Sequence, residues 1–158
     1  MRMQKIGKLV DRATEIVVMV LGGSIFALGV LQVFFRYVVQ ASLGWSEELS
    51  RYLFVWLIFI GSALALPKGS HIAIDVLVNE LPIRVRKWVH GFASICVMVF
   101  FIFLTIEGLK LCNLAQGQTS AAMEIPMGIA YLCIPLGSLL MFMNTFGALM
   151  ESKRGEER

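Results

Sequence analysis

The sequence predicts an all-α integral membrane protein with four transmembrane helices, both termini cytoplasmic, plus a short interfacial amphipathic helix between helices two and three. Three observations lead to this fold class. Of the 158 residues, 58% are hydrophobic and only 16% are charged, whereas about a quarter of an ordinary soluble domain is charged. Four long uncharged runs divide the chain, and Lys and Arg gather in the segments on one side of them. We therefore expect the bilayer to surround a single four-helix domain, residues 1–158.

The first helix is expected over residues 13–36. Residues 16–35 carry no charge, and they are long enough to cross a hydrocarbon core of about 30 Å at ~1.5 Å per residue. A basic lead followed by an apolar run is also the pattern of a signal peptide, but a signal peptide has only about 7–15 apolar residues. We interpret the run as a retained helix. Gly23 and Ala27 form a small-xxx-small pair on it, which suits close helix packing.

The second helix is expected over residues 46–67 and begins with a charged turn. Ser46 suits the N-cap position, and Glu47 and Glu48 follow where the positive end of the helix dipole favours carboxylates. Arg51 lies four residues after Glu47 and three after Glu48, so the three side chains are expected to share one face of the helix.

The uncharged part of this helix is short. Residues 52–67 number 16 and cover about 24 Å of a core that is about 30 Å thick. Either the bilayer thins locally or the charged first turn approaches the headgroup boundary, where its charges need partners. The alternative for that turn is a solvated cap with a weak surface ion pair. Gly61 and Ala65 form a second small-xxx-small pair on this helix.

An interfacial helix is expected over residues 70–80, because apolar residues gather on one side of that segment. His71 and Asp75 lie four residues apart on it, within reach of a mutual hydrogen bond.

The third transmembrane helix is expected over residues 83–110. Its base combines three cations with an aromatic residue, a pattern typical of contacts with lipid headgroups: Arg84, Arg86, Lys87 and Trp88.

The fourth helix is expected over residues 126–150, beginning at Pro126, a residue type that suits a helix start. Pro135 lies inside it and should produce a kink about one turn earlier.

The cations set the orientation: four in the lead, four in the second loop and three in the tail make 11 on one side, against three on the other, summing to 14. By the positive-inside rule, both termini are cytoplasmic and the charged turn of helix two lies outside.

The middle of every expected span is uncharged, whereas a transporter that moves ions by itself normally needs an ionisable residue there. We interpret the polar residues inside the spans as helix–helix hydrogen-bonding or otherwise satisfied groups, and not as a translocation path: Ser24, Gln32, Ser94, Thr105, Ser138 and Asn144. Haem is disfavoured because the two histidines, His71 and His90, are placed apart. The sequence has no motif for metal binding or catalysis, so we expect no enzyme and no metal site. The net charge of +3 follows membrane orientation and does not indicate nucleic-acid binding.

The middle third of the chain, residues 34–82, carries an ordered set of aromatic, charged and small residues: Arg36-Tyr37, Trp45, Glu47-Glu48, Arg51, Trp56, Gly61, His71 and Asp75. This order resembles the DctQ type of small membrane subunit in tripartite ATP-independent periplasmic (TRAP) transporters, whose members have four transmembrane helices. The resemblance implies a bacterial or archaeal inner-membrane complex. Its three parts would be a periplasmic substrate-binding protein, a large membrane subunit and this chain.

The resemblance also implies a division of labour. The large subunit would hold the substrate and sodium sites, so no cofactor is expected in this chain and sodium ions are expected in the partner. A sodium gradient would drive uptake of organic acids such as dicarboxylates or sialic acid, with this chain as the scaffold. The implied partner-interface residues are Arg36, Trp45, Glu47, Glu48 and Arg51 on the outer side, with His71 and Asp75 on the inner side. Two alternatives stay open: a stand-alone small four-helix transporter, and the membrane anchor of a redox complex.

Overall fold

The computed structural model describes the backbone of residues 2–78 and 83–156, and the side chains of residues 9–66, 89 and 91–149. The long helices are α1 (Arg2–Phe34), α2 (Gly44–Val78), α3 (Ile83–Leu114) and α5 (Cys133–Glu156), and the short helix α4 (Met127–Tyr131) precedes α5. A π-helix (Phe35–Val39) ends α1, and a 3-10 helix (Ala115–Gly117) follows α3. Four helical segments are long and apolar enough to cross a membrane: Leu9–Val39, Gly44–Leu66, Gly91–Gly117 and Met127–Leu149. The prediction of an all-α protein with four spans is therefore confirmed.

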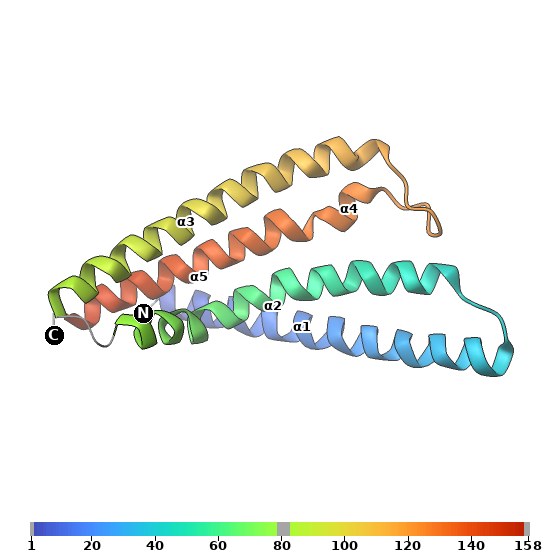
Figure 1. The fold of residues 1–158 in the computed structure, drawn as a ribbon, viewed down its shortest axis with the longest axis horizontal. Coiled ribbons are helices and arrows are strands. Elements are labelled where there is room, and N and C mark those ends of the chain that lie inside the picture. Colours follow the sequence, from blue (N-terminus) through green and yellow to red (C-terminus); the bar gives the residue numbers. More distant parts are fainter. Residues whose placement is uncertain (1, 79–82, 157–158) are drawn as a thin grey trace.

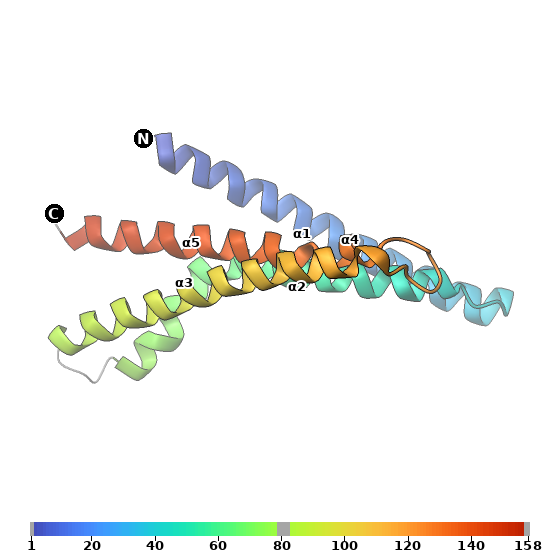
Figure 2. The ribbon, with the colours of Figure 1, turned by 90° about the horizontal axis from the view of Figure 1, so that it is seen from above.

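The four long helices lie side by side in the order α1, α2, α5, α3 (Figure 1). Helix α1 packs mainly against α2, α2 against α5, and α5 against α3. Seen from above, the helices form one layer that is thin at one end and fans out toward the end holding the two termini, where α1 and α3 lie on opposite sides of α5 (Figure 2). We call the opposite end, with residues 35–47 and 115–126, the loop end. Helices α2 and α5 both begin there and run in the same direction.

The start of α2 differs from the prediction. The helix begins at Gly44, and Ser46 lies inside its first turn instead of capping it. The Ser46 side chain is fully buried, and its hydroxyl donates a hydrogen bond to the carbonyl of Leu43 at 2.7 Å. An N-cap side chain must accept a bond from a backbone N–H, so the N-cap prediction for Ser46 is wrong.

The end of α2 is longer than predicted. The helix continues through Pro67 to Val78 as one element, so the expected interfacial helix over residues 70–80 is joined to α2 where the structure describes it. Residues 79–80 lie outside the described backbone. The location of this segment at the membrane surface stays a prediction, as does the cytoplasmic side for the termini.

The expected kink before Pro135 is confirmed, because the helix is interrupted at Leu132, between α4 and α5. Proline has no backbone N–H and its ring crowds the preceding turn. Gly108 of α3 provides the room for this irregular turn. A Cβ added to Gly108 would lie 3.0 Å from both the Ile134 side chain and the Pro135 ring.

Helices α2, α3 and α5 enclose the small core of the layer. Its buried residues are Ala63, Phe101 and Met141, one from each helix. Helices α2 and α5 approach closely at Gly137 of α5, where an added Cβ would lie only 2.7 Å from the Cβ of Phe59 in α2.

Polar groups inside the spans join neighbouring helices. The Gln32 amide donates to the Ser50 hydroxyl at 3.1 Å, and the hydroxyls of Thr105 and Ser138 lie 2.8 Å apart. A third bond joins the Asn144 amide of α5 to a backbone carbonyl of α2. The predicted role in helix–helix hydrogen bonding is therefore confirmed for four side chains: Gln32, Thr105, Ser138 and Asn144.

Candidate interaction site at the loop end

Glu48 joins the start of α2 to the loop between α3 and α4. Its carboxylate accepts hydrogen bonds from three consecutive backbone amides, those of Ala121 at 3.2 Å, Ala122 at 2.9 Å and Met123 at 3.1 Å. The Tyr52 hydroxyl donates a fourth bond at 2.7 Å. A carboxylate has about four lone-pair positions, so Glu48 is fully occupied by its own chain. We call Glu48 and Tyr52 the latch.

The loop that the latch holds, residues 118–126, folds back on itself. The amide of Ser120 donates to the carbonyl of Ile125 at 2.9 Å, and the amide of Met127 donates to the carbonyl of Gln118 at 2.8 Å. Glu124 has a φ of 55°, a left-handed conformation that non-glycine residues rarely adopt. Such a strained turn persists only when its surroundings hold it in place, and the Glu48 carboxylate does so from the side.

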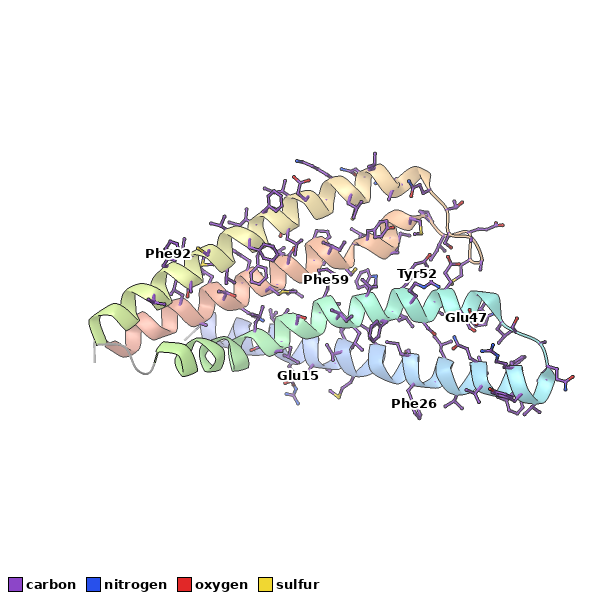
Figure 3. The ribbon with its side chains drawn as sticks, viewed as in Figure 1. Glu15, Phe26, Glu47, Tyr52, Phe59 and Phe92 are labelled. Atoms are coloured by element: carbon purple, nitrogen blue, oxygen red, sulfur yellow. The ribbon has the colours of Figure 1, made fainter. Side chains whose placement is uncertain are left out.

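Tyr52 reaches from α2 toward this loop (Figure 3). Besides its bond to Glu48, its hydroxyl oxygen lies 3.3 Å from the sulfur of Met127, at the start of α4. A phenol has one hydrogen, so the short bond to the carboxylate uses it and the sulfur makes a packing contact. The latch therefore aligns three elements: α2, the loop and α4.

The other predicted outer residues behave differently from Glu48. Arg36, on the π-helix, and both Glu47 and Arg51, on α2, are exposed, and Trp45 is 41% exposed. Within the described residues, Glu47, Glu48 and Arg51 form no ion pair with one another, so the alternative of a weak surface ion pair at this turn is not what the structure has. The structure brings Glu48 to the loop and leaves the charges of Glu47 and Arg51 at the surface.

The predicted inner residues cannot be placed as side chains. His71 and Asp75 lie on α2, and the headgroup set Arg84, Arg86, Lys87 and Trp88 lies on α3, but all six side chains are outside the described residues. Their roles stay predictions.

The two small-xxx-small pairs face away from the core. Gly23 and Ala27 are exposed on α1, and Ala65 is exposed on α2. A Cβ added to Gly23 or to Gly61 would meet nothing within 4 Å. If these four residues pack against a helix, as predicted, that helix belongs to another chain.

Two glycines at close helix–helix contacts are not predicted by the sequence pattern. Gly108 and Gly137 each lie opposite a side chain of another helix, yet neither belongs to the small-xxx-small pairs that were selected. Tyr52 was not selected either, although its position four residues after Glu48 places it on the same face of α2.

Comparisons with known proteins cover nearly the whole chain. Residues 25–155 match the family described as tripartite ATP-independent periplasmic transporters, DctQ component. A Haemophilus influenzae protein named as a TRAP transporter small permease protein is 30% identical over 161 residues, which cover 98% of this chain and 94% of that protein.

Two further relatives carry substrate names. The C4-dicarboxylate TRAP transporter small permease protein DctQ of Rhodobacter capsulatus is 34% identical over 102 residues, covering 63% of this chain and 45% of that protein. The sialic acid TRAP transporter permease protein SiaT of Haemophilus influenzae is 31% identical over 125 residues, covering 77% of this chain but 20% of that much longer protein. In SiaT, a segment similar to this chain is therefore part of a larger permease polypeptide.

Proposed function

The chain belongs to the DctQ component family of the tripartite ATP-independent periplasmic transporters, multi-pass proteins of the bacterial inner membrane, and from this we propose that it is the scaffold subunit of such a transporter. It supports and orients the large membrane subunit and does not bind the transported solute itself. Its partners are that large subunit, a periplasmic substrate-binding protein and phospholipids.

The single-layer arrangement is the observation that carries this proposal. In a layer, an inner helix has two neighbours and an outer helix has one, so much of the apolar surface is left for lipid or for another protein. Phe26 on α1 and Phe92 on α3 point away from the layer at its two edges (Figure 3). A substrate path through a membrane must be lined by polar groups and shielded from lipid, and a single layer is poorly suited to enclose one. It is well suited to lie along a larger subunit.

The polar groups of the spans also support a scaffold. The bonds Gln32–Ser50 and Thr105–Ser138 pair side chains of neighbouring helices. In hydrocarbon, an unpaired polar group is costly, and pairing it across two helices favours one arrangement of them. These residues therefore fix the packing of the helices, and they are not free to coordinate a moving solute.

The transported solute is an organic acid, by analogy with relatives named for C4-dicarboxylate and sialic acid. We assign the driving force to a sodium gradient and place the sodium ions in the large subunit. This chain then needs no cofactor and catalyses no reaction. Arg36, Trp45, Glu47 and Arg51, which are exposed at the loop end, are available to contact the large subunit or the binding protein.

Reconstitution tests the proposal. Vesicles that contain this chain alone should accumulate no C4-dicarboxylate or sialic acid under an inward sodium gradient. Vesicles that also contain the large subunit, supplied with the binding protein, should accumulate one of these solutes, and omission of this chain should abolish uptake. Uptake by this chain alone, or full uptake without it, would refute the scaffold role.

The outward small-xxx-small pair on α1 gives a second prediction. Gly23→Leu should leave the chain folded, because a Cβ added at this exposed position meets nothing within 4 Å, but it should reduce co-purification with the large subunit if a partner helix packs there. The matched control is Gly147→Leu on α5, which is equally unobstructed within the chain. Equal recovery of the large subunit by the Gly23 variant and the unchanged chain would show that this face contacts lipid.

A further inference from the structure

A proline interrupts the hydrogen-bond ladder of α2 one turn after a buried residue, Ala63. In an α-helix, the N–H of each residue bonds to the carbonyl four residues earlier. Pro67 lies within α2 and has no N–H, so it cannot donate to the carbonyl of Ala63. Ala63 is 0% exposed and belongs to the core of the layer. A buried carbonyl without a donor is costly, and more so where lipid replaces water.

The missing donor is supplied by another helix. The side-chain amide nitrogen of Asn144, on α5, donates to the carbonyl oxygen of Ala63 at 2.8 Å. A carbonyl can only accept, so this contact also fixes which end of the Asn144 amide faces α2. The residues are brought within reach because α2 and α5 run in the same direction and approach closely at Gly137, two helical turns before Asn144.

Helix α2 bends beyond this point. Figure 2 shows its last part, in green, turning away from the line of the rest of the helix. Sharp bends in helices usually occur at proline, where the lost bond and the ring both open the preceding turn. Because Pro67 has no N–H, the backbone at Ala63 has one hydrogen bond fewer within α2. A contact from α5 can therefore decide the direction of the bend.

We propose that Asn144 is a positioning residue that replaces the backbone donor removed by Pro67, and that it thereby fixes the bend of α2 against α5. The segment 68–78, which forms the last part of α2, leaves the layer in the direction that this bond sets. The inference does not depend on the proposed function, because it concerns the packing of this chain alone.

The proposal differs from an ordinary helix–helix hydrogen bond in one respect. Most such bonds in membranes contribute little, because their groups find other partners when the bond is lost. The Ala63 carbonyl has no donor at the fourth residue along its own helix, so removal of Asn144 should leave it unpaired. Restoration of the N–H at position 67 should make Asn144 dispensable.

A double-mutant cycle on the purified full chain in detergent micelles tests this expectation. In the chain with Pro67, Asn144→Leu should lower the midpoint of thermal unfolding by ~2–4 °C. In the Pro67→Ala background, where residue 67 again has an N–H, the same substitution should produce less than half of that shift. Equal shifts in both backgrounds would overturn the proposal. Pro67→Leu also restores the N–H and serves as the second background if Pro67→Ala does not insert.

The matched control is Asn113→Leu, because Asn113 is exposed at the end of α3 and, among the residues whose side chains are described, its side chain bonds only to the nearby Gln116 amide at 3.4 Å. Its effect should be small and the same in both backgrounds.

A second measurement does not depend on any proline variant. With a 13C=18O label on Ala63, the amide I band of that carbonyl should move to higher wavenumber in Asn144→Leu. An unchanged band would also overturn the proposal.

Discussion

Replacement of Glu48 by alanine is expected to release the loop 118–126 and to remove most of the uptake by the reconstituted transporter, while the chain still inserts and folds. The substitution leaves three backbone amides and the Tyr52 hydroxyl without their acceptor. The loop contains a left-handed Glu124, and without the lateral bonds this strained turn has less to hold it. Limited proteolysis from the side of the membrane on which the loop end lies should then cut the loop faster, and solute uptake measures the functional loss.

Glu47→Ala is the matched control, because Glu47 is an exposed carboxylate of the same turn that takes no part in the latch. It should leave the proteolysis rate of the loop unchanged. Tyr52→Phe should give a partial effect, since it removes one of the four bonds to Glu48 and keeps the aromatic ring. A Glu48→Ala chain with normal loop protection would show that the loop holds its shape without the latch. Normal uptake by that chain would show that the shape of the loop does not matter for transport.

The number of spans and one kink could be predicted because they depend on local sequence. A long uncharged run must be a membrane helix wherever its neighbours lie, and a proline inside a helix removes a bond at a fixed distance along the chain. The interruption at Leu132 follows from Pro135 alone. The bend near Pro67 is not among the predictions, because the short uncharged run indicates a helix that ends at residue 67.

The role of Glu48 could not be predicted, because its partners are distant in the sequence. Helical spacing predicts that Glu47, Glu48 and Arg51 share one face of α2, whereas in the structure only Glu48 bonds to the loop and the other two stay exposed. Helical spacing does not indicate that a later loop returns to bond to Glu48 and not to Glu47. The amide of Ala122, which bonds to Glu48, is 74 residues away in the sequence. Ser46 is likewise buried at the loop end by tertiary packing. This packing outweighs the preference of serine for the N-cap position.

The glycines also show that a local sequence pattern does not predict which tertiary contacts form. A small-xxx-small pattern identifies faces that permit close approach, but whether a helix of the same chain uses that face depends on the fold. Gly23 and Gly61 lie on open surfaces, whereas Gly108 and Gly137 lie at the tight contacts. The pattern thus missed the glycines that pack the layer internally, and the open faces that it selected remain candidates for contact with the large subunit.

Gly137→Ala is expected to lower the free energy of unfolding of the chain by ~1–3 kcal/mol, the usual cost of overpacking a tight contact. The new methyl group would lie 2.7 Å from the Cβ of Phe59 and 3.0 Å from its carbonyl oxygen. These atoms belong to the start of a rigid side chain and to the backbone, so α2 and α5 must move apart. Thermal or dodecyl sulfate unfolding of the purified chain in detergent measures the loss.

Gly147→Ala is the matched control for Gly137→Ala. Gly147 lies on the same helix, and an added Cβ meets nothing within 4 Å, so only the higher helix propensity of alanine, up to ~1 kcal/mol, should act there. The difference between the two variants then isolates the contact at Phe59 from the propensity gain that both share. If Gly137→Ala were as stable as Gly147→Ala, the two helices could not approach as closely as described, and the bond between Asn144 and the Ala63 carbonyl, further along the same pair, would lose its geometric basis.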